Sequence, residues 1–183
     1  VLRSITAASL ALLIGTSCGG NSSSSIGSPA SATGANATVT SSNAPAVFAT
    51  AFAQVFSVMG QGATVITKPV TPQGSGTLNG TVSGTAKFDG TVTAASTGTT
   101  IKSKITFDDF SNGGGIWMQG DLNYEFITKT SPTVSIDGSI TGTINIAGNN
   151  KATLVWDIDF TNSLPSGSMK ITSDGNTFTY NLQ

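Results

Sequence analysis

From residue 77 onward, apolar and polar side chains alternate along the chain with a period of two. In the first such stretch the even positions from Leu78 to Val92 are apolar or glycine, and the odd positions between them are polar. One-sided alternation is typical of antiparallel strands with one buried face. Requiring the same alternation across each connection predicts seven strands, at residues 77–94, 99–107, 115–128, 133–147, 151–161, 168–173 and 176–182.

Two Asp-Gly pairs could form hairpin turns, and the alternation distinguishes between them. A two-residue turn at 174–175 pairs Ile171 with Phe178, so both apolar side chains share a face. The same turn at 137–138 would place Ile136 opposite Ser139, which mixes apolar and polar side chains. We therefore expect a turn at the first site and a continuous strand at the second. Because the connections are short, the simplest topology is a meander.

A helix is predicted before the sheet, over residues 44–60. Ser42 or Asn43 suits its N-cap, Pro45 suits its first turn and Gly60 its C-terminal cap. Large apolar residues follow at the spacing of one helical face: Phe48, Phe52, Val55, Phe56 and Met59. The helix carries no charge, which favours burial. The fold class is therefore mainly β with one helix, a curved antiparallel meander of about seven strands packed on the helix, as an open or partly closed barrel.

The predicted register brings small residues together on the inner face of this sheet. It places Gly138 between Tyr124 and Phe160, and Gly142 between Gly120 and Trp156. The full predicted row consists of Gly90, Ser103, Gly120, Gly142, Trp156 and Ser173. Such a row would let the sheet curl around the helix. The alternative interpretation is that the glycines only reflect a glycine-rich composition.

Composition narrows the possible functions. A chain of 183 residues with 38% hydrophobic side chains is long enough for one core, and we expect one domain. Only 9% of the residues are charged and the formal net charge is -1, so nucleic acid is not an expected partner. The chain has no histidine and one cysteine, which removes the usual proton shuttle, imidazole metal ligands and an internal disulfide. No metal or cofactor is expected.

The single cysteine follows a segment that has the features of an export signal. Arg3 precedes the apolar run 5–14, which is too short to span a bilayer, and the small residues 15–17 lead to Cys18. This arrangement resembles the processing site of bacterial lipoproteins, although Gly15 stands where that family normally has Leu. The resemblance implies that Cys18 carries a lipid after the leader is removed, and the Gly that follows it implies the outer membrane. The alternative is an ordinary secretory signal that contains a cysteine.

These features divide the chain into three parts. Residues 1–17 form the predicted signal peptide. Residues 18–42 are rich in Ser, Gly, Ala, Asn and Thr and are predicted to be a lipid-anchored flexible linker. Residues 43–183 are predicted to be a single β-rich domain that begins with the helix.

One loop and one neighbouring aromatic are the candidate partner contacts. The predicted loop 108–115 contains Asp108, Asp109 and Phe110 beside a run of glycines, and loops carry function more often than strands do. Trp117 falls on the outward face, where it either contacts a partner or covers the loop. A surface hairpin without a binding role is the alternative for the loop.

Charged side chains on the outward strand faces have two interpretations. Paired carboxylates can bind Ca²⁺ or serve a glycosidase, whereas on a solvated strand face they more often form cross-strand ion pairs. The second interpretation is favoured for this group, which consists of Asp121, Glu125, Asp157, Asp159, Lys102, Lys104, Lys129 and Lys151.

The sequence thus predicts an exported, lipid-anchored envelope protein with a structural or binding role and no catalytic activity. Its expected partners are the membrane, through the lipid on Cys18, and an envelope protein or glycan. The alternative function is a carrier that holds an apolar or lipid ligand on the concave side of the sheet.

Overall fold

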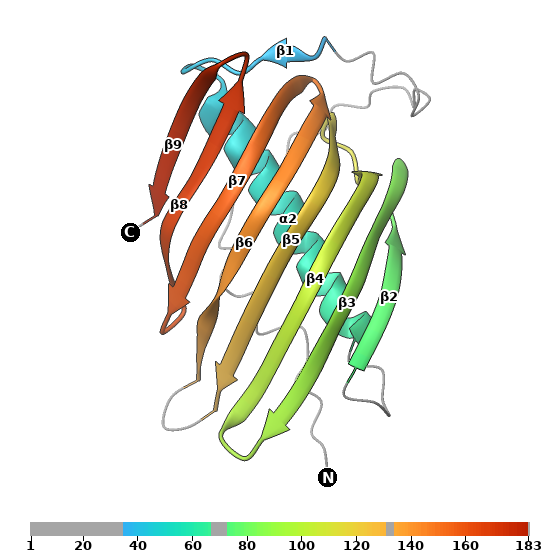
Figure 1. The fold of residues 1–183 in the computed structure, drawn as a ribbon, viewed down its shortest axis with the longest axis vertical. Helices are drawn as coiled ribbons and strands as arrows, with labels where there is room; N and C mark the ends of the chain where they lie inside the picture. The colour runs from blue at the N-terminus through green and yellow to red at the C-terminus, as the bar shows by residue number, and fades with distance from the viewer. Residues whose placement is uncertain (1–34, 67–72, 131–133, 183) are drawn as a thin grey trace.

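The computed structural model describes residues 35–66, 73–130 and 134–182, and these form one helix and nine strands (Figure 1). The elements in chain order are β1 (Ala37–Thr38), α2 (Ala44–Ile66), β2 (Gln73–Asn79), β3 (Ser83–Ala95), β4 (Gly98–Ser111), β5 (Ile116–Lys129), β6 (Ser135–Gly148), β7 (Asn150–Thr161), β8 (Leu164–Ser173) and β9 (Asn176–Leu182). The predicted signal peptide, Cys18 and the linker up to residue 34 lie outside the described residues.

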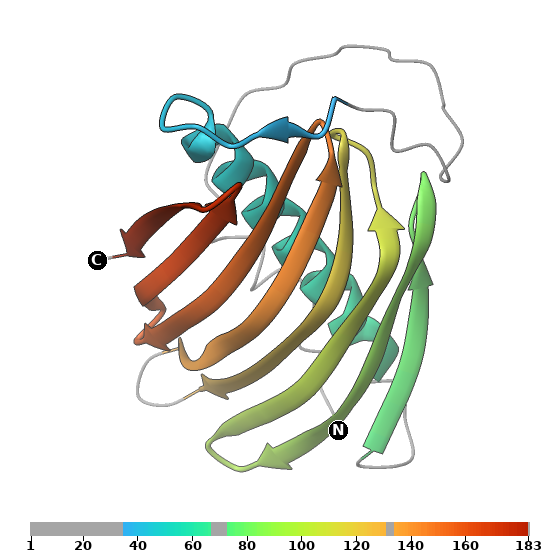
Figure 2. The same cartoon turned by 45° about the horizontal axis from the view of Figure 1, so that its top comes forward.

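Eight strands form an antiparallel meander in the order β2-β3-β4-β5-β6-β7-β8-β9. The two-residue strand β1 lies off this path and pairs in parallel with the start of β7. The sheet curves around α2, which crosses its concave side diagonally (Figures 1 and 2). It does not close into a barrel, because β2 and β9 form its two edges. The prediction of a mainly β, open curved meander with one N-terminal helix is confirmed.

The predicted strand 77–94 is wrong, because it is two strands, β2 and β3. They form a hairpin in which Asn79 pairs with Thr85, so the five residues 80–84 separate the last paired positions. A loop with an odd number of residues keeps the even positions on the same face on both sides of the turn, and Leu78 accordingly pairs with Ala86. The alternation therefore passes through the hairpin without a break.

Two other predicted connections are also wrong. The predicted loop before residue 168 is a two-residue turn at Asn162-Ser163, with φ of 53° and 69°, and β8 already begins at Leu164. This turn contains no Gly to mark it. The predicted loop 108–115 is shorter, because β4 continues to Ser111 through an irregularity in its pairing with β5.

The two Asp-Gly predictions are confirmed. Asp174 and Gly175 have φ of 47° and 80°, the positive values of a tight hairpin turn, and Ile171 pairs with Phe178. The other pair, 137–138, lies inside β6.

The helix begins as predicted and ends later than predicted. Asn43 precedes Ala44 and accepts the backbone N–H of Val47, while its side chain accepts the N–H of Thr40 at 2.7 Å. The helix then continues past Gly60 to Ile66, so Gly60 is not its cap. Gly62 lies against β3, where a Cβ atom would stand 2.0 Å from a ring carbon of Phe88. Glycine at this position allows the close approach of the helix to the sheet.

The buried stripe of α2 contains Val55 and Met59, as predicted, but not the predicted phenylalanines. Val47, Ala51, Val55, Val58 and Met59 are at most 4% exposed and pack on the inner face of the sheet. The predicted helical phenylalanines flank this stripe and are only partly buried.

Ring stacking joins these flanking phenylalanines to the last strands of the sheet. Phe52 stacks on Trp156 with ring centroids 5.9 Å apart, and Phe48 stacks on Tyr180 at 4.9 Å. The aromatic side chains therefore connect the helix to β7 and β9, while the aliphatic stripe fills the centre.

The predicted row of small residues is only partly correct. Gly90 pairs with Ser103, and Gly142 pairs with Trp156, as predicted. Ser103 pairs with Tyr124 instead of Gly120. Gly142 pairs with Leu122, and Gly138 with Phe126, because the connection between β5 and β6 is two residues longer than expected. These glycines occupy inner-face positions but do not form one row.

The folded domain begins before the predicted boundary at residue 43. Val39 is fully buried, and its N–H is bonded to the side chain of Ser173 at 3.1 Å. Ser173 in turn donates to the carbonyl oxygen of Lys151 at 2.6 Å, and the Thr38 hydroxyl donates to Asp174. Residues 35–42 are therefore attached to the ends of β7 and β8 and are not part of a free linker.

We predict opposite effects for two glycine substitutions. Gly142 has φ of 141°, and a Cβ there would stand 2.3 Å from the carbonyl oxygen of Asp121. Gly142→Ala should lower the free energy of unfolding by about 2–4 kcal/mol because of backbone strain and overpacking. Gly60 is helical with open space around it, so Gly60→Ala should raise that free energy by about 0.5–1 kcal/mol. Urea denaturation measures both, and equal effects would contradict the prediction.

Candidate functional site

The structure separates the residues predicted to contact a partner. Asp108 and Asp109 lie at the pairing irregularity of β4, and both are exposed. Asp109 has φ of 47°, and its carbonyl oxygen accepts the Ser83 hydroxyl at 2.9 Å. Phe110 is 1% exposed and packs edge-on against Phe107, so its ring belongs to the core.

Trp117 lies on the outer face of β5, away from Phe110, and is partly buried. A Cβ atom on Gly148 would stand 2.5 Å from the Trp117 ring, so the indole covers the backbone of β6 at that point. Its Nε1 is buried and has no hydrogen-bond partner among the described residues. Trp117 therefore packs over the backbone of its own sheet.

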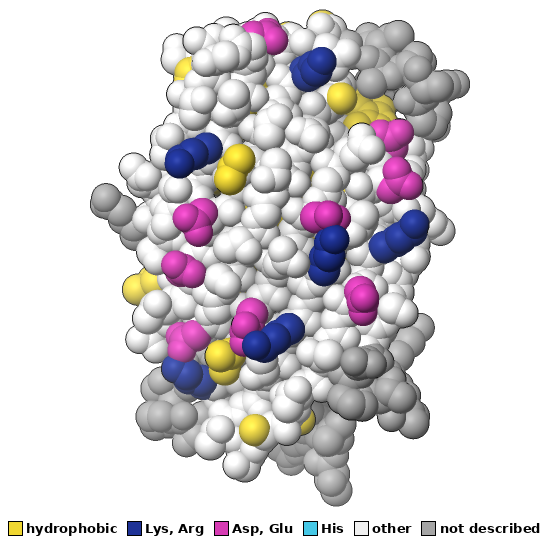
Figure 3. All heavy atoms as spheres, in the orientation of Figure 1, with side chains coloured by type: hydrophobic (Ala, Val, Ile, Leu, Met, Phe, Trp, Pro, Cys, Tyr) yellow, Lys and Arg dark blue, Asp and Glu magenta, His cyan; other side chains and the backbone are white. Residues whose placement is uncertain are grey.

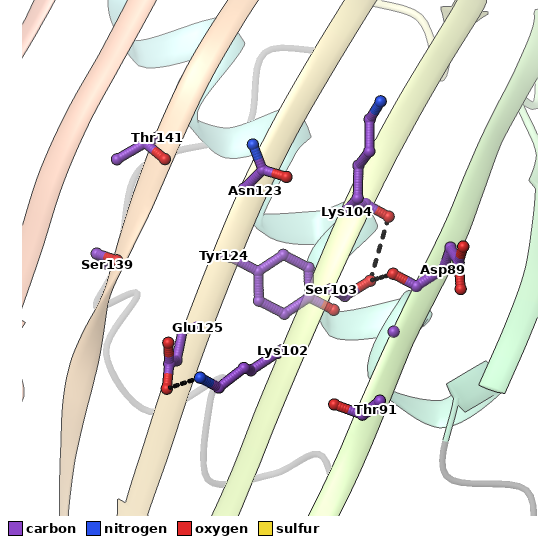
Figure 4. A pocket seen from close by; sticks show the side chains of 11 residues that line it. Asp89, Thr91, Lys102, Ser103, Lys104, Asn123, Tyr124, Glu125, Ser139 and Thr141 are labelled. Atoms are coloured by element: carbon purple, nitrogen blue, oxygen red, sulfur yellow. Dashed lines mark hydrogen bonds and ion pairs between the residues drawn. The ribbon is translucent and has the colours of Figure 1, made fainter. Parts of the chain in front are cut away.

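A different group of residues gathers on the outer face of the sheet. They line an open depression of about 450 Å³ across β3, β4, β5 and β6 (Figure 4). The polar side chains at its rim are Asp89, Thr91, Lys102, Lys104, Asn123, Glu125, Ser139 and Thr141. Gly90, Ser103 and Tyr124, from inner-face positions, complete the floor. We call this group the outer-face depression.

Cross-strand register brings these side chains together. Lys102 pairs with Glu125, and their charged atoms are 2.9 Å apart. Lys104 reaches Asp121 at 2.9 Å, and Thr106 donates to the same carboxylate at 2.7 Å. The Lys104 ammonium and the Thr106 hydroxyl hold the pKa of the Asp121 carboxyl below its ordinary value. These pairs are about half exposed, so each contributes at most about 1 kcal/mol to stability.

A third ion pair joins Lys129, the last residue of β5, to Asp137 near the start of β6. The ammonium of Lys129 and the backbone N–H of Asn162 lower the pKa of the Asp137 carboxyl. Figure 3 shows that charged side chains of both signs are scattered over this face, with a few hydrophobic side chains among them. The outer face therefore offers many hydrogen-bonding groups and no strong field of one sign.

On the inner side of the sheet beneath the depression, the Tyr124 ring is buried. Its hydroxyl makes no hydrogen bond to any of the described residues. Burial raises the pKa of Tyr124 to about 12, and the nearby Ser103 side chain opposes part of that rise. The Ser103 hydroxyl donates to the backbone carbonyl oxygens of Asp89 and Lys104, each at 3.2 Å. The floor of the depression is thus polar but mostly withdrawn from solvent.

A second open depression, of about 410 Å³, lies on the solvent side of α2. It is lined by Ala49, Thr50, Ala53, Gln54, Ser57 and Asn112. Gln54 donates to the carbonyl oxygen of Gly113 at 2.6 Å and so holds the loop 112–115 against the helix. This surface consists mainly of small side chains and has few groups that could orient a ligand.

The described residues contain no group of three or more His, Cys, Asp or Glu side chains that could hold a metal ion. In the same part of the chain, no helix is long and apolar enough to cross a membrane. Comparisons with family models, curated proteins and solved structures found no match. Function is therefore inferred from the chain's own residues.

Sequence reasoning identified the outward charges but missed the depression that they form. The alternation assigned Lys102, Lys104 and Glu125 to the outer face. It could not show which of these side chains form ion pairs, because that depends on the register of the strands. The predicted register would have placed Ser103 beside Gly120, whereas the structure places it beside Tyr124. Correcting this register requires knowing both that β4 continues to Ser111 and that its pairing with β5 shifts between Phe107 and Phe110.

The buried phenol predicts a specific dependence of stability on pH. The folded state favours neutral Tyr124, so this contribution is complete below pH 10 and is lost as the pH rises toward 12. Two pKa units correspond to about 2–3 kcal/mol. Denaturation of the wild type and of Tyr124→Phe between pH 9 and 12 measures the effect, and the wild type should lose more stability. Parallel curves for the two proteins would contradict the prediction.

Proposed function

We propose that this protein is an exported, lipid-anchored envelope protein whose β domain binds a glycan through the outer-face depression, without catalysis. The observation that carries the binding part is the convergence of hydrogen-bonding side chains from four neighbouring strands on one depression. The anchoring part rests on the leader and on Cys18.

The sequence supports the anchor at several points. A basic residue, a short apolar run and small residues precede Cys18, the chain's one cysteine, in the order that bacterial lipoproteins use. Gly19 follows, and the lipoprotein pattern connects that residue with the outer membrane rather than with retention at the inner membrane. The residues that follow Cys18 are rich in Ser, Gly, Ala, Asn and Thr, a composition that suits a tether between the lipid and the domain.

The chemistry of the depression favours a glycan over a protein. Sugar hydroxyls both donate and accept hydrogen bonds, and the rim supplies ammonium, carboxylate, amide and hydroxyl groups in a small area. Protein interfaces depend on buried aromatic or arginine anchors, and the outer rim of this depression offers none. The opposite charges of Lys102 and Glu125 also cancel at the site, which suits a largely neutral ligand.

The carrier alternative has less support. A carrier needs space on the concave side of the sheet, and α2 crosses that side in this fold (Figure 2). Inner-face side chains such as Trp156, Phe107 and Ile140 are at most 1% exposed and pack in the same cluster as the helix. The outer face remains the better candidate for ligand binding.

Binding can be tested with isolated peptidoglycan sacculi and a panel of soluble envelope polysaccharides as probes. Lys102→Ala and Asn123→Ala should each weaken binding up to about tenfold, because each removes one or two hydrogen bonds to the ligand. Asp157→Asn is the matched control on the outer face of β7, outside the depression, and should bind like the wild type. Cosedimentation and calorimetry provide the affinities.

Thermal unfolding of the same variants separates binding from folding. All three residues are exposed, so Tm should change little. Wild-type protein that binds none of the probes, or variants that bind as tightly as it does, would rule out the glycan site. Pull-down of an envelope protein that Lys102→Ala releases would instead identify a protein partner.

The anchor is tested by expressing the full chain beside Cys18→Ala. The native protein should show the mass of a lipid-modified chain cut before Cys18 and should fractionate with membranes. The variant should lack the added mass and leave the membrane fraction. A soluble, unmodified native protein would eliminate the anchor and leave a secreted domain, while the glycan assay would remain valid.

A further inference from the structure

One edge of the sheet lacks the features by which proteins usually block edge pairing. Strand β9, Asn176–Leu182, has the sequence NTFTYNL, with no charged residue and no proline. It pairs with β8 on one side only, and none of the described residues pairs with its other side. Exposed edges normally carry lysine, proline or a bulge to prevent association with another strand.

The hairpin geometry identifies which backbone groups of β9 are free. Ser173 and Asn176 flank a two-residue turn, so they form a hydrogen-bonded pair, and every second residue from Asn176 also bonds to β8. The N–H and C=O groups of Thr177, Thr179 and Asn181 therefore point away from the sheet. These three residues have polar side chains on the outer face.

We propose that two copies of this chain associate by antiparallel pairing of β9 with β9, around a two-fold axis between the two Thr179 residues. In this register each Thr179 exchanges both backbone hydrogen bonds with its counterpart, and Thr177 pairs with Asn181 of the second copy. The eight-stranded meanders become one continuous sheet. This pairing is independent of the glycan proposal.

The inner face of the strand fits this register. Between the hydrogen-bonded pairs, Phe178 of each copy lies opposite Tyr180 of the other, where Cα atoms approach to about 4.5 Å. Phe178 and Tyr180 are only partly buried in the single chain, so pairing covers apolar ring surface. Cross-strand aromatic pairs are among the more stabilising contacts between antiparallel strands.

Several observations favour a second copy over an unrelated strand. Because β9 is uncharged, it can face itself without repulsion, and its free groups are symmetric about Thr179. The opposite edge, β2, is a poorer match because its inner positions include Gly74 and Gly76, which offer no side chain to bury. Pairing of β2 with β9 would also repeat without closing and would give open polymers instead of a dimer.

Cysteine cross-linking tests the register in the full chain with Cys18→Ser, where an added cysteine is the only thiol. Residues of a hydrogen-bonded antiparallel pair have Cα atoms about 5.5 Å apart, within the range that a disulfide bridges. Thr179→Cys should therefore oxidise to a covalent dimer. Thr177→Cys is the matched control on the same strand and face, and it should cross-link much less because it lies opposite Asn181.

Sedimentation provides a second measurement on the same background. The protein should be dimeric, and Thr179→Lys should make it monomeric by placing two ammonium groups opposite each other. Thr172→Lys, on the same face of β8, should remain dimeric, and circular dichroism shows whether each variant is folded. A monomeric parent protein, equal cross-linking at 177 and 179, or open polymers would each overturn the proposal.

Discussion

The whole fold depends on covering one apolar sheet face with one helix. Each strand of the meander has an apolar inner side, and α2 is the one described helix on that side. Twenty-three helical residues span about 34 Å, and eight strands span about the same distance from edge to edge. The length of the helix thus matches the width of the sheet. A shorter helix ending at Gly60 would leave the β2 and β3 end of the inner face uncovered.

This division of surfaces determines where function can lie. The inner face and the helix are used for the core, with Trp156 and Phe52 stacked between them. The outer face carries mainly polar side chains. Because its exposed ion pairs contribute little to stability, breaking them to contact a ligand costs the fold little. A binding role on the outer face is therefore compatible with the fold, whereas a ligand on the concave side would compete with the core.

The sequence predicted the faces of the strands well and their register poorly, for physical reasons. Side-chain alternation reports which face a residue occupies, and it is unchanged by any loop with an odd number of residues, such as the one after Asn79. It also gives no warning of an irregularity such as the one at Asp108 and Asp109, or of a turn without glycine at Asn162. The outer-face depression depends on the register of four strands, so it could be found only in the structure.

Low charge connects the remaining features of the molecule. Only 9% of the residues are charged, so the polar character of the outer face comes largely from Ser, Thr and Asn. The edge strand β9 carries no lysine. The same composition that makes the outer face suitable for hydrogen bonding therefore leaves β9 open to pairing. If Cys18 holds the domain at a membrane, neighbouring copies are confined to a thin layer, which raises their effective concentration. Under that confinement, pairing between the uncharged β9 edges of neighbouring copies is favoured more strongly than between freely diffusing molecules.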